Sequence, residues 1–229
     1  MKKNVVFICS ILILNFSLSA QKTELVTVKA GTKVIDYFPL KERYRYPEFT
    51  TGQVLFKNGA GSTSKLNYNL LMGEMEFIQY RDTLSIIKKK DIRLIVVAQD
   101  TFYYDNGYLE QIAGGQFKVV LKEYIKLKEI LSKDSYGTSS SGSATNSYGY
   151  LPSDGNFYKL AANKDMVFQK TQEYYFATPS SGFVQYSKKN VIRFFPQKED
   201  DIKAYLKSNK VDFDSREDLL RLADYLHGL

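Results

Sequence analysis

Residues 101–112 read Thr-Phe-Tyr-Tyr-Asp-Asn-Gly-Tyr-Leu-Glu-Gln-Ile, and this stretch decides the fold class. Two runs rich in aromatic and aliphatic residues, Thr101–Tyr104 and Tyr108–Ile112, flank the sequence Asp105-Asn106-Gly107. Asn and Gly both accept the positive φ that a type I′ turn requires. The stretch therefore predicts a β-hairpin.

Similar short runs of β-favouring residues continue on both sides of this hairpin, from Leu25 to Leu131. They recur about every 8–12 residues, with turn residues and no helical pattern between them, which favours antiparallel meanders over βαβ units. The other predicted strands are Leu25–Lys29, Gln53–Lys57, Lys65–Leu70, Glu74–Gln79, Thr83–Lys88, Ile92–Ala98 and Gln116–Leu127. We therefore predict an α+β protein whose antiparallel β body, meander-like or sandwich-like, spans residues 21–131.

One turn in this body also predicts a register. With Met72-Gly73 as a two-residue loop, Leu70 would face Met75 and Tyr68 would face Phe77. This pairing gathers apolar residues on one face of the hairpin and places Asn69 beside Glu76 on the other. A slip of one residue would mix the two faces, so packing favours this register.

The composition changes at residues 132–156, which contain eight Ser and four Gly. Such a segment has too little apolar surface to bury, and it is predicted to be a flexible loop. Residues 157–186 return to strand-like runs, at Phe157–Ala161, Met166–Gln169 and Tyr174–Ala177. Because three short strands rarely form a stable domain alone, we expect them to join the same sheet.

Residues 187–229 have a helical period and are predicted to form three short helices. Pro196 suits the first position of the second helix, and Asn209 is a plausible left-handed residue at its end. Ser215 is expected to cap the third helix, with Asp218 three residues later as in a capping box. An apolar stripe in that helix comprises Leu219, Leu222, Ala223 and Leu226.

Residues 1–20 have the pattern of a cleaved secretory signal peptide. Lys2 and Lys3 precede an apolar run from Val5 to Leu14, and small residues lead up to Ala20. The run is about half the ~20 residues of a membrane-spanning helix, and no transmembrane segment is expected after cleavage. Loss of the two lysines lowers the formal net charge from +7 to +5, a balance that does not favour nucleic acid as a partner of an exported protein. The predicted location is periplasmic or secreted.

The chain has one Cys and one His, and neither lies in the interior of the mature sequence. Cys9 lies in the signal peptide, and His227 is two residues from the C-terminus in the last turn of a predicted helix. This excludes disulfide frameworks, Cys proteases, His-dependent triads in the body and zinc sites of His and Cys. No cofactor, metal ligand or catalytic residue is assigned.

The most site-like group of residues comprises Asn67, Asn69, Glu74 and Glu76. Alternate residues of a strand point to the same face, so the two glutamates would lie about 7 Å apart, a separation at which glycoside-cleaving carboxylates operate. Alternating glutamates are also common on a solvated sheet face. The four residues are therefore candidate binding residues, with the acid and base of a glycan hydrolase as the alternative.

Several short motifs give the chain a resemblance to a group of exported bacterial proteins of unknown function. They are Gly52-x-Val54-x-Phe56-Lys57-Asn58-Gly59, Leu66-Asn67-Tyr68-Asn69, Gly73-Glu74-Met75-Glu76-Phe77-Ile78 and the segment from Lys188 to Phe213. The resemblance implies an envelope or extracellular setting, in a Gram-negative bacterium, and it brings no activity or site residue with it.

The sequence thus favours an exported binding or interaction module of the cell envelope without catalytic activity, whose partner is an envelope protein or a polysaccharide. The absence of interior His and Cys in a β-rich, Tyr-rich body supports this hypothesis. A carboxylate-dependent glycan hydrolase using Glu74 and Glu76 is the alternative, and a purely structural subunit is a third reading. The ligand and the oligomeric state are left open.

Overall fold

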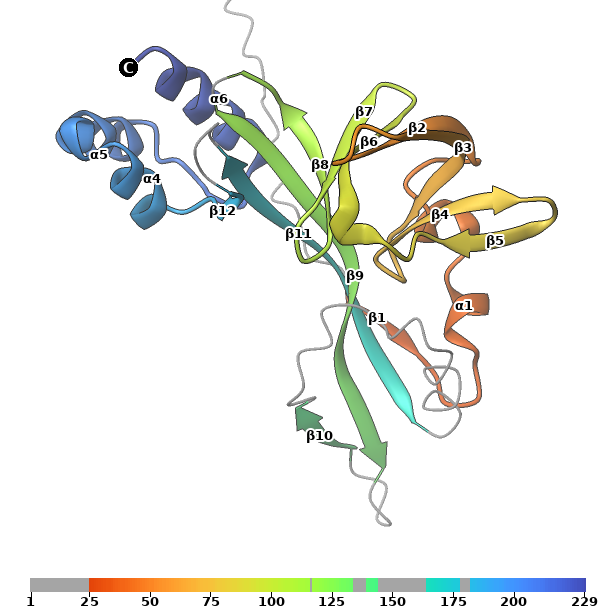
Figure 1. The fold of residues 1–229 in the computed structure, drawn as a ribbon. Coiled ribbons are helices and arrows are strands. Elements are labelled where there is room, and N and C mark those ends of the chain that lie inside the picture. Colours follow the sequence, from red (N-terminus) through yellow and green to blue (C-terminus); the bar gives the residue numbers. More distant parts are fainter. Residues whose placement is uncertain (1–24, 116, 134–138, 144–163, 178–181) are drawn as a thin grey trace, which may run out of the picture.

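The computed structural model describes residues 25–115, 117–133, 139–143, 164–177 and 182–229, and it is an α+β protein built on one antiparallel sheet (Figure 1). The predicted signal peptide and the predicted strand Phe157–Ala161 lie outside the described residues. The strands are β1 (Leu25–Val28), β2 (Thr50–Phe56), β3 (Gly61–Asn69), β4 (Glu74–Gln79), β5 (Asp82–Ser85), β6 (Ile92–Val97), β7 (Asp100–Tyr104), β8 (Tyr108–Ala113), β9 (Lys118–Lys133), β10 (Ser139–Ser143), β11 (Asp165–Ala177) and β12 (Val184–Gln185). The helices are α1 (Val34–Tyr37), α2 (Leu40–Arg43), α4 (Lys188–Phe194), α5 (Glu199–Ser208) and α6 (Arg216–His227), with short 3₁₀ turns at Lys89–Asp91 and Pro196–Lys198.

The strand order is β1-β11-β9-β8-β7-β6-β2-β3-β4-β5, with β10 added to β9 and β12 to β11. Every pairing is antiparallel, and most neighbours are consecutive in the chain. The turn at Asp105–Gly107 gives both Asn106 and Gly107 a positive φ, of 49° and 129°. This confirms the role predicted for them. A backbone hydrogen bond from Ile125 of β9 to the carbonyl oxygen of Leu70 (2.9 Å) draws the end of β3 back toward β9, so the sheet is curled.

Strands β9 and β11 form a long ribbon that runs through the molecule, with the curled strands to one side and α4–α6 at one end (Figure 1). The same face of this ribbon packs against two separate groups of buried residues. The sheet core includes Tyr68, Met75, Ile95, Phe102, Tyr108, Ile125 and Phe168. The helix core includes Val119, Phe176, Val191, Ile202, Leu219, Leu222 and Leu226. The chain therefore returns from the loop to the same sheet, as expected.

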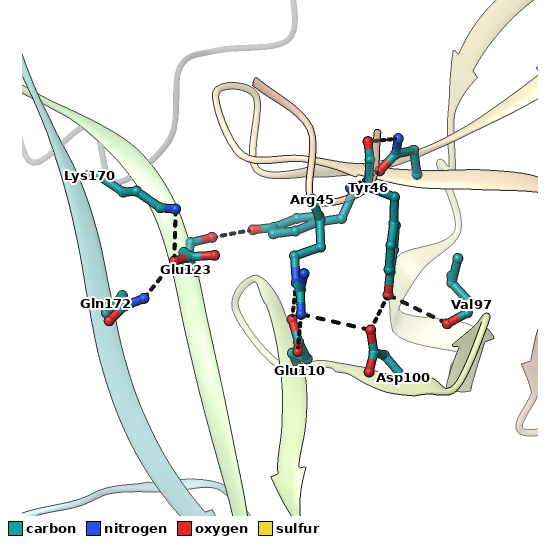
Figure 2. Close-up of polar contacts among 10 residues, drawn as sticks. Arg45, Tyr46, Val97, Asp100, Glu110, Glu123, Lys170 and Gln172 are labelled. Carbon is teal, nitrogen blue, oxygen red and sulfur yellow. Dashed lines mark hydrogen bonds and ion pairs between the residues drawn. The ribbon is translucent and has the colours of Figure 1, made fainter. Parts of the chain in front are cut away.

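Polar side chains lie on the ribbon between the two cores. Glu123 of β9 accepts a hydrogen bond from Gln172 Nε2 (2.6 Å) and forms an ion pair with Lys170 Nζ (3.2 Å). Both partners are on β11 (Figure 2). The backbone oxygen of Glu123 also accepts a hydrogen bond from Tyr68 Oη at 3.0 Å. Buried polar groups need such partners, and this cluster divides the apolar surface of the ribbon into two parts.

The three predicted C-terminal helices are present as α4, α5 and α6. Ser215 Oγ accepts the amide hydrogen bond of Asp218 (3.3 Å), as predicted for the N-cap of α6. Asn209, however, has a right-handed backbone conformation, and the left-handed residue after α5 is Lys210, with φ of 47°. The Asn209 side chain explains the difference, because its Nδ2 donates to the carbonyl oxygen of Tyr205 (2.9 Å) and keeps Asn209 in the helical turn.

The predicted register of the β3–β4 hairpin is wrong by two residues. Tyr68 faces Met75 and Asn69 faces Glu74, so residues 70–73 form a four-residue loop. The Asn69 side chain accounts for the longer loop, because its Oδ1 accepts hydrogen bonds from the amides of Leu71 and Met72, both at 3.1 Å. A shift of two residues keeps each side chain on its face, and the predicted division into an apolar and a polar face is retained.

The predicted loop at 132–156 is partly strand. β9 continues to Lys133, and residues 139–143 pair with residues 129–133 as β10. The backbone groups of a long strand offer hydrogen bonds to a neighbour of any composition, which is why a Ser/Gly-rich segment extends the sheet here. Residues 134–138 and 144–156 lie outside the described residues.

Candidate functional site

The four candidate residues lie together on one face of the β3–β4 hairpin. Asn67 is paired with Glu76 across the two strands, and Asn69 is paired with Glu74. Their exposed fractions are 1% and 3% for the two asparagines, 7% for Glu74 and 9% for Glu76. The residues are thus adjacent, but this polar face is buried.

Glu76 is held by two donors from the same chain. Tyr44 Oη donates to its Oε2 at 2.6 Å, and Asn69 Nδ2 donates to its Oε1 at 3.1 Å. Burial raises the pKa of the Glu76 carboxyl above its ordinary value, although the hydrogen bonds from Tyr44 and Asn69 oppose the shift. Burial and the hydrogen bond to Glu76 raise the pKa of the Tyr44 hydroxyl.

The Asn67 side chain attaches the segment 43–46 to β3. Asn67 Oδ1 accepts from the amide of Tyr46 (3.1 Å), and Asn67 Nδ2 donates to the carbonyl oxygen of the same residue (2.9 Å). Backbone hydrogen bonds from Arg45 to Tyr68 and from Leu70 to Arg43 complete the pairing. The Asn67 side chain therefore binds the backbone amide and carbonyl of Tyr46, and so extends the pairing between segment 43–46 and β3 beyond the backbone hydrogen bonds.

Glu74 is bound less completely than Glu76. Its Oε1 contacts Lys89 Nζ, whereas its Oε2 is buried without a hydrogen-bond partner. The hydroxyl of Tyr108, a residue of the sheet core that is 1% exposed, is also buried without a partner. A third buried atom without a hydrogen-bond partner is Arg43 Nε, in the segment 43–46.

Arg45 extends the polar contacts of segment 43–46 to two further strands (Figure 2). Its Nε and Nη2 donate to the two carboxylate oxygens of Glu110 on β8, at 2.7 and 2.8 Å. Its Nη2 also lies 3.8 Å from Asp100 on β7, which accepts a hydrogen bond from Tyr46 Oη at 2.7 Å. Bidentate pairs of this kind are among the stronger polar contacts in proteins.

Sequence reasoning did not find Arg45, Asp100 or Glu110. The residues that meet here are 55 to 65 positions apart, and only the register of the curled sheet brings them together. With Glu76, Asn67 and Asn69 they form one network, whose common partner is the segment 43–46. Through these contacts the network holds that segment against the sheet.

A hollow of a different kind lies on the C-terminal helices. It is a shallow groove of about 580 Å³, lined by Lys188, Lys203, Leu206, Lys207, Lys210, Val211 and Phe213. We call it the lysine groove. Leu206 is buried, Val211 and Phe213 are half-buried, and the four lysines are exposed, so the groove combines an apolar floor with a basic rim.

The lysines of the groove differ in their partners. Lys203 forms an ion pair with Glu199 one turn earlier in α5, at 2.5 Å. Within the described ranges, Lys188, Lys207 and Lys210 have no carboxylate within ion-pair distance. Their positive charge is open to an anionic group from outside.

The groove was also not predicted from the sequence, although the sequence contains a signal for it. Lys203 and Lys207 are four residues apart in a predicted helix, a spacing that places both on one side. The prediction for that helix rested on its apolar positions alone. Lys188 and Phe213 come from other segments and join the groove only through the packing of α4 and α5.

Among the described residues, no group of three or more His, Cys, Asp or Glu side chains is placed to hold a metal ion. None of the helices in the described part of the chain is long and apolar enough to cross a membrane.

Comparison with protein-family models, with curated proteins and with solved structures found no match to this chain. The geometry of the two candidate regions is therefore the basis for a functional proposal.

Proposed function

We propose that this protein is an exported, non-catalytic binding module of the cell envelope, and that the lysine groove is its contact surface. One observation carries the proposal. Lys188, Lys207 and Lys210 surround an apolar floor, and no carboxylate of the described residues pairs with them. Lysines that only keep a helix soluble do not need an apolar surface beside them, whereas a binding surface uses both the charge and the apolar area.

The polar network of the sheet supports the non-catalytic part of the proposal. An acid and base pair must come within hydrogen-bond reach of the groups on which it acts. Both oxygens of Glu76 instead bind Tyr44 and Asn69, and Glu74 is 7% exposed and contacts Lys89. No observation favours the glycan-hydrolase alternative over this structural role.

The envelope setting rests on the sequence. Residues 1–20 have the pattern of a cleaved signal peptide, and the mature chain would carry a formal net charge of +5. A basic protein is attracted to the anionic surfaces that an envelope presents, and a basic groove would direct this attraction to one place.

The proposal is tested by partner capture with a charge-matched control. The mature protein is crosslinked to envelope extract as wild type, as the groove variant Lys188→Gln/Lys207→Gln/Lys210→Gln, and as the control variant Lys65→Gln/Lys88→Gln/Lys90→Gln. The control removes the same charge from exposed lysines of β3 and of the segment between β5 and β6, outside the helices α4–α6. Wild type and control should capture the same partner, and the groove variant should lose it.

Equal capture by all three proteins would reject the groove as the contact surface. A second measurement addresses the non-catalytic claim, because wild type and Glu74→Gln and Glu76→Gln variants can be compared on a panel of glycans. Hydrolysis by the wild type that either substitution abolishes would reject that claim.

A further inference from the structure

We infer that the lysine groove binds an acidic polypeptide segment that inserts one hydrophobic side chain between the lysines. This inference rests on the proposed function and names the chemistry of the partner at the same surface. It follows from the floor, the rim and the size of the groove taken together.

The floor favours an apolar group on the partner. Leu206 is 7% exposed, and the ring of Phe213 packs against Tyr186 with 6.1 Å between the ring centroids. The floor is thus fixed by the helix core. Water on such a floor is released when an apolar side chain covers it.

The rim requires negative charge beside that group. Because Lys203 is paired with Glu199, the rim lysines without a carboxylate partner among the described residues are Lys188, Lys207 and Lys210. In an extended polypeptide, side chains that point the same way are about 7 Å apart. Acidic residues two positions before and after the hydrophobic residue point to the same side as it does, and can therefore reach lysines of the rim.

The size fits a short segment rather than a folded surface. A volume of about 580 Å³ lies within the range of roughly 300–1,000 Å³ that ligand sites occupy. It accommodates one large side chain and the backbone beside it. Because the rim lysines are exposed, the contact should be weak, and added salt should weaken it further.

Other anionic partners fit one part of the groove but not both. An anionic polysaccharide supplies charge to the rim and has no hydrophobic side chain to fill the floor. A flat bilayer surface also meets the rim, but the buried Leu206 cannot project into it. The combination of floor and rim favours the polypeptide.

The test uses a synthetic, fluorescein-labelled peptide with a central Phe and acidic residues on both sides. Fluorescence anisotropy measures its binding to the full mature protein and to the groove and control variants described above. We expect the groove variant to bind about tenfold more weakly than wild type, as the loss of several exposed charge pairs implies. The control variant should bind like wild type, and Lys188→Arg/Lys207→Arg/Lys210→Arg should retain most of the affinity.

A second peptide tests the floor, with Ser in place of the central Phe. It should bind at least about tenfold more weakly, because the burial of a Phe side chain is lost. Equal binding of the Phe and Ser peptides would overturn the inference, since the groove would then recognise charge alone. Circular dichroism and thermal unfolding of each variant establish that it is folded.

Three other results would also overturn the inference, and they identify a different occupant. Vesicles of anionic phospholipid that sediment wild type but not the groove variant would indicate a membrane surface. Binding of an anionic polysaccharide in place of the peptide would indicate a glycan. Dimerisation of wild type that the groove substitutions abolish would indicate a second copy of the chain.

The two proposals fail in different ways. If groove-dependent capture from envelope extract succeeds and the Phe peptide does not bind, the acidic-segment inference is wrong and the proposed function stands. If capture does not depend on the groove and the peptide does not bind, both are wrong.

Discussion

The sheet core and the helix core share the β9–β11 ribbon, but charged side chains have different surroundings beside each of them. Beside the sheet core, Arg45, Glu76 and Glu110 are bound by other groups of the chain. Beside the helix core, Lys188, Lys207 and Lys210 surround an apolar groove without a carboxylate partner among the described residues. The difference separates charges that hold a segment in place from charges that are available to a partner.

The largest effect is expected from a cavity in the helix core. Leu222 is fully buried there, and Leu222→Ala should lower the free energy of unfolding by about 3 kcal/mol through lost packing and a residual cavity. Hydrogen exchange should show the loss of protection in α4–α6 and much less in β2–β8. Leu84→Ala on the exposed strand β5 is the control and should have little effect. Equal loss of protection in both regions would show that the two cores unfold as one unit.

A smaller effect is expected when the bound charges of the sheet are disrupted. Arg45→Met leaves Glu110, whose side chain is 8% exposed, without its bidentate partner. Urea denaturation should show a loss of about 2 kcal/mol, less than for a fully buried pair because Arg45 is partly exposed.

Two control variants sharpen the measurement on Arg45. Arg45→Met/Glu110→Leu should recover part of the lost stability, because no unpaired charge remains buried. Lys203→Met removes an exposed ion pair of the groove rim and should change the urea midpoint little. A loss for Lys203→Met as large as that for Arg45→Met would contradict the distinction between the two regions.

The contact between α6 and the residue before β9, at His227, should contribute still less. Its Nε2 lies 3.0 Å from the backbone amide nitrogen of Phe117, which donates to it, and the two rings are in contact. His227→Ala should lower the free energy of unfolding by about 1 kcal/mol, the usual net value of one hydrogen bond. Thermal unfolding measures it, with the distant Lys65→Ala as control, and an unchanged midpoint would show that packing alone docks α6.

The smallest effect concerns pH. Because burial raises the pKa of Glu76 in the folded state, the protonated form is favoured on folding. Its contribution to the free energy of unfolding is therefore fully present below the ordinary pKa of 4.5. That contribution is lost as the pH rises through the raised pKa of the folded state. Urea denaturation of wild type and Glu76→Gln at several pH values should show the wild type losing stability relative to the variant as the pH rises. The opposite trend would mean that the hydrogen bonds from Tyr44 and Asn69 outweigh burial.

Local signals predicted much of the architecture. The bounds of β4 agree with the predicted Glu74–Gln79, and Asn106, Gly107 and Ser215 have the roles that their chemistry predicts. In each case the residues that decide the structure are near one another in the chain. The register of β3–β4 was wrong although it is local, because a side chain, Asn69, replaces backbone partners in the loop.

The candidate residues of the hairpin show the limit of such signals. The alternation of side chains along a strand predicted that four polar residues share one face, and the structure agrees. They are Asn67, Asn69, Glu74 and Glu76. Alternation cannot tell whether a polar face is wet or covered, and here the segment 43–46 is attached to it. The resemblance to exported proteins and the signal peptide remain predictions.

The sequence by itself determined the antiparallel sheet, the three C-terminal helices and the alternation of polar and apolar faces. These depend on turn chemistry, capping and periodicity, which act over a few residues. Only the tertiary structure decided which charges are bound within the chain and which are open. Arg45 meets Glu110 across 65 positions, and the lysine groove joins α4, α5 and the segment that follows. Such contacts depend on how strands and helices pack, and no short stretch of sequence specifies that.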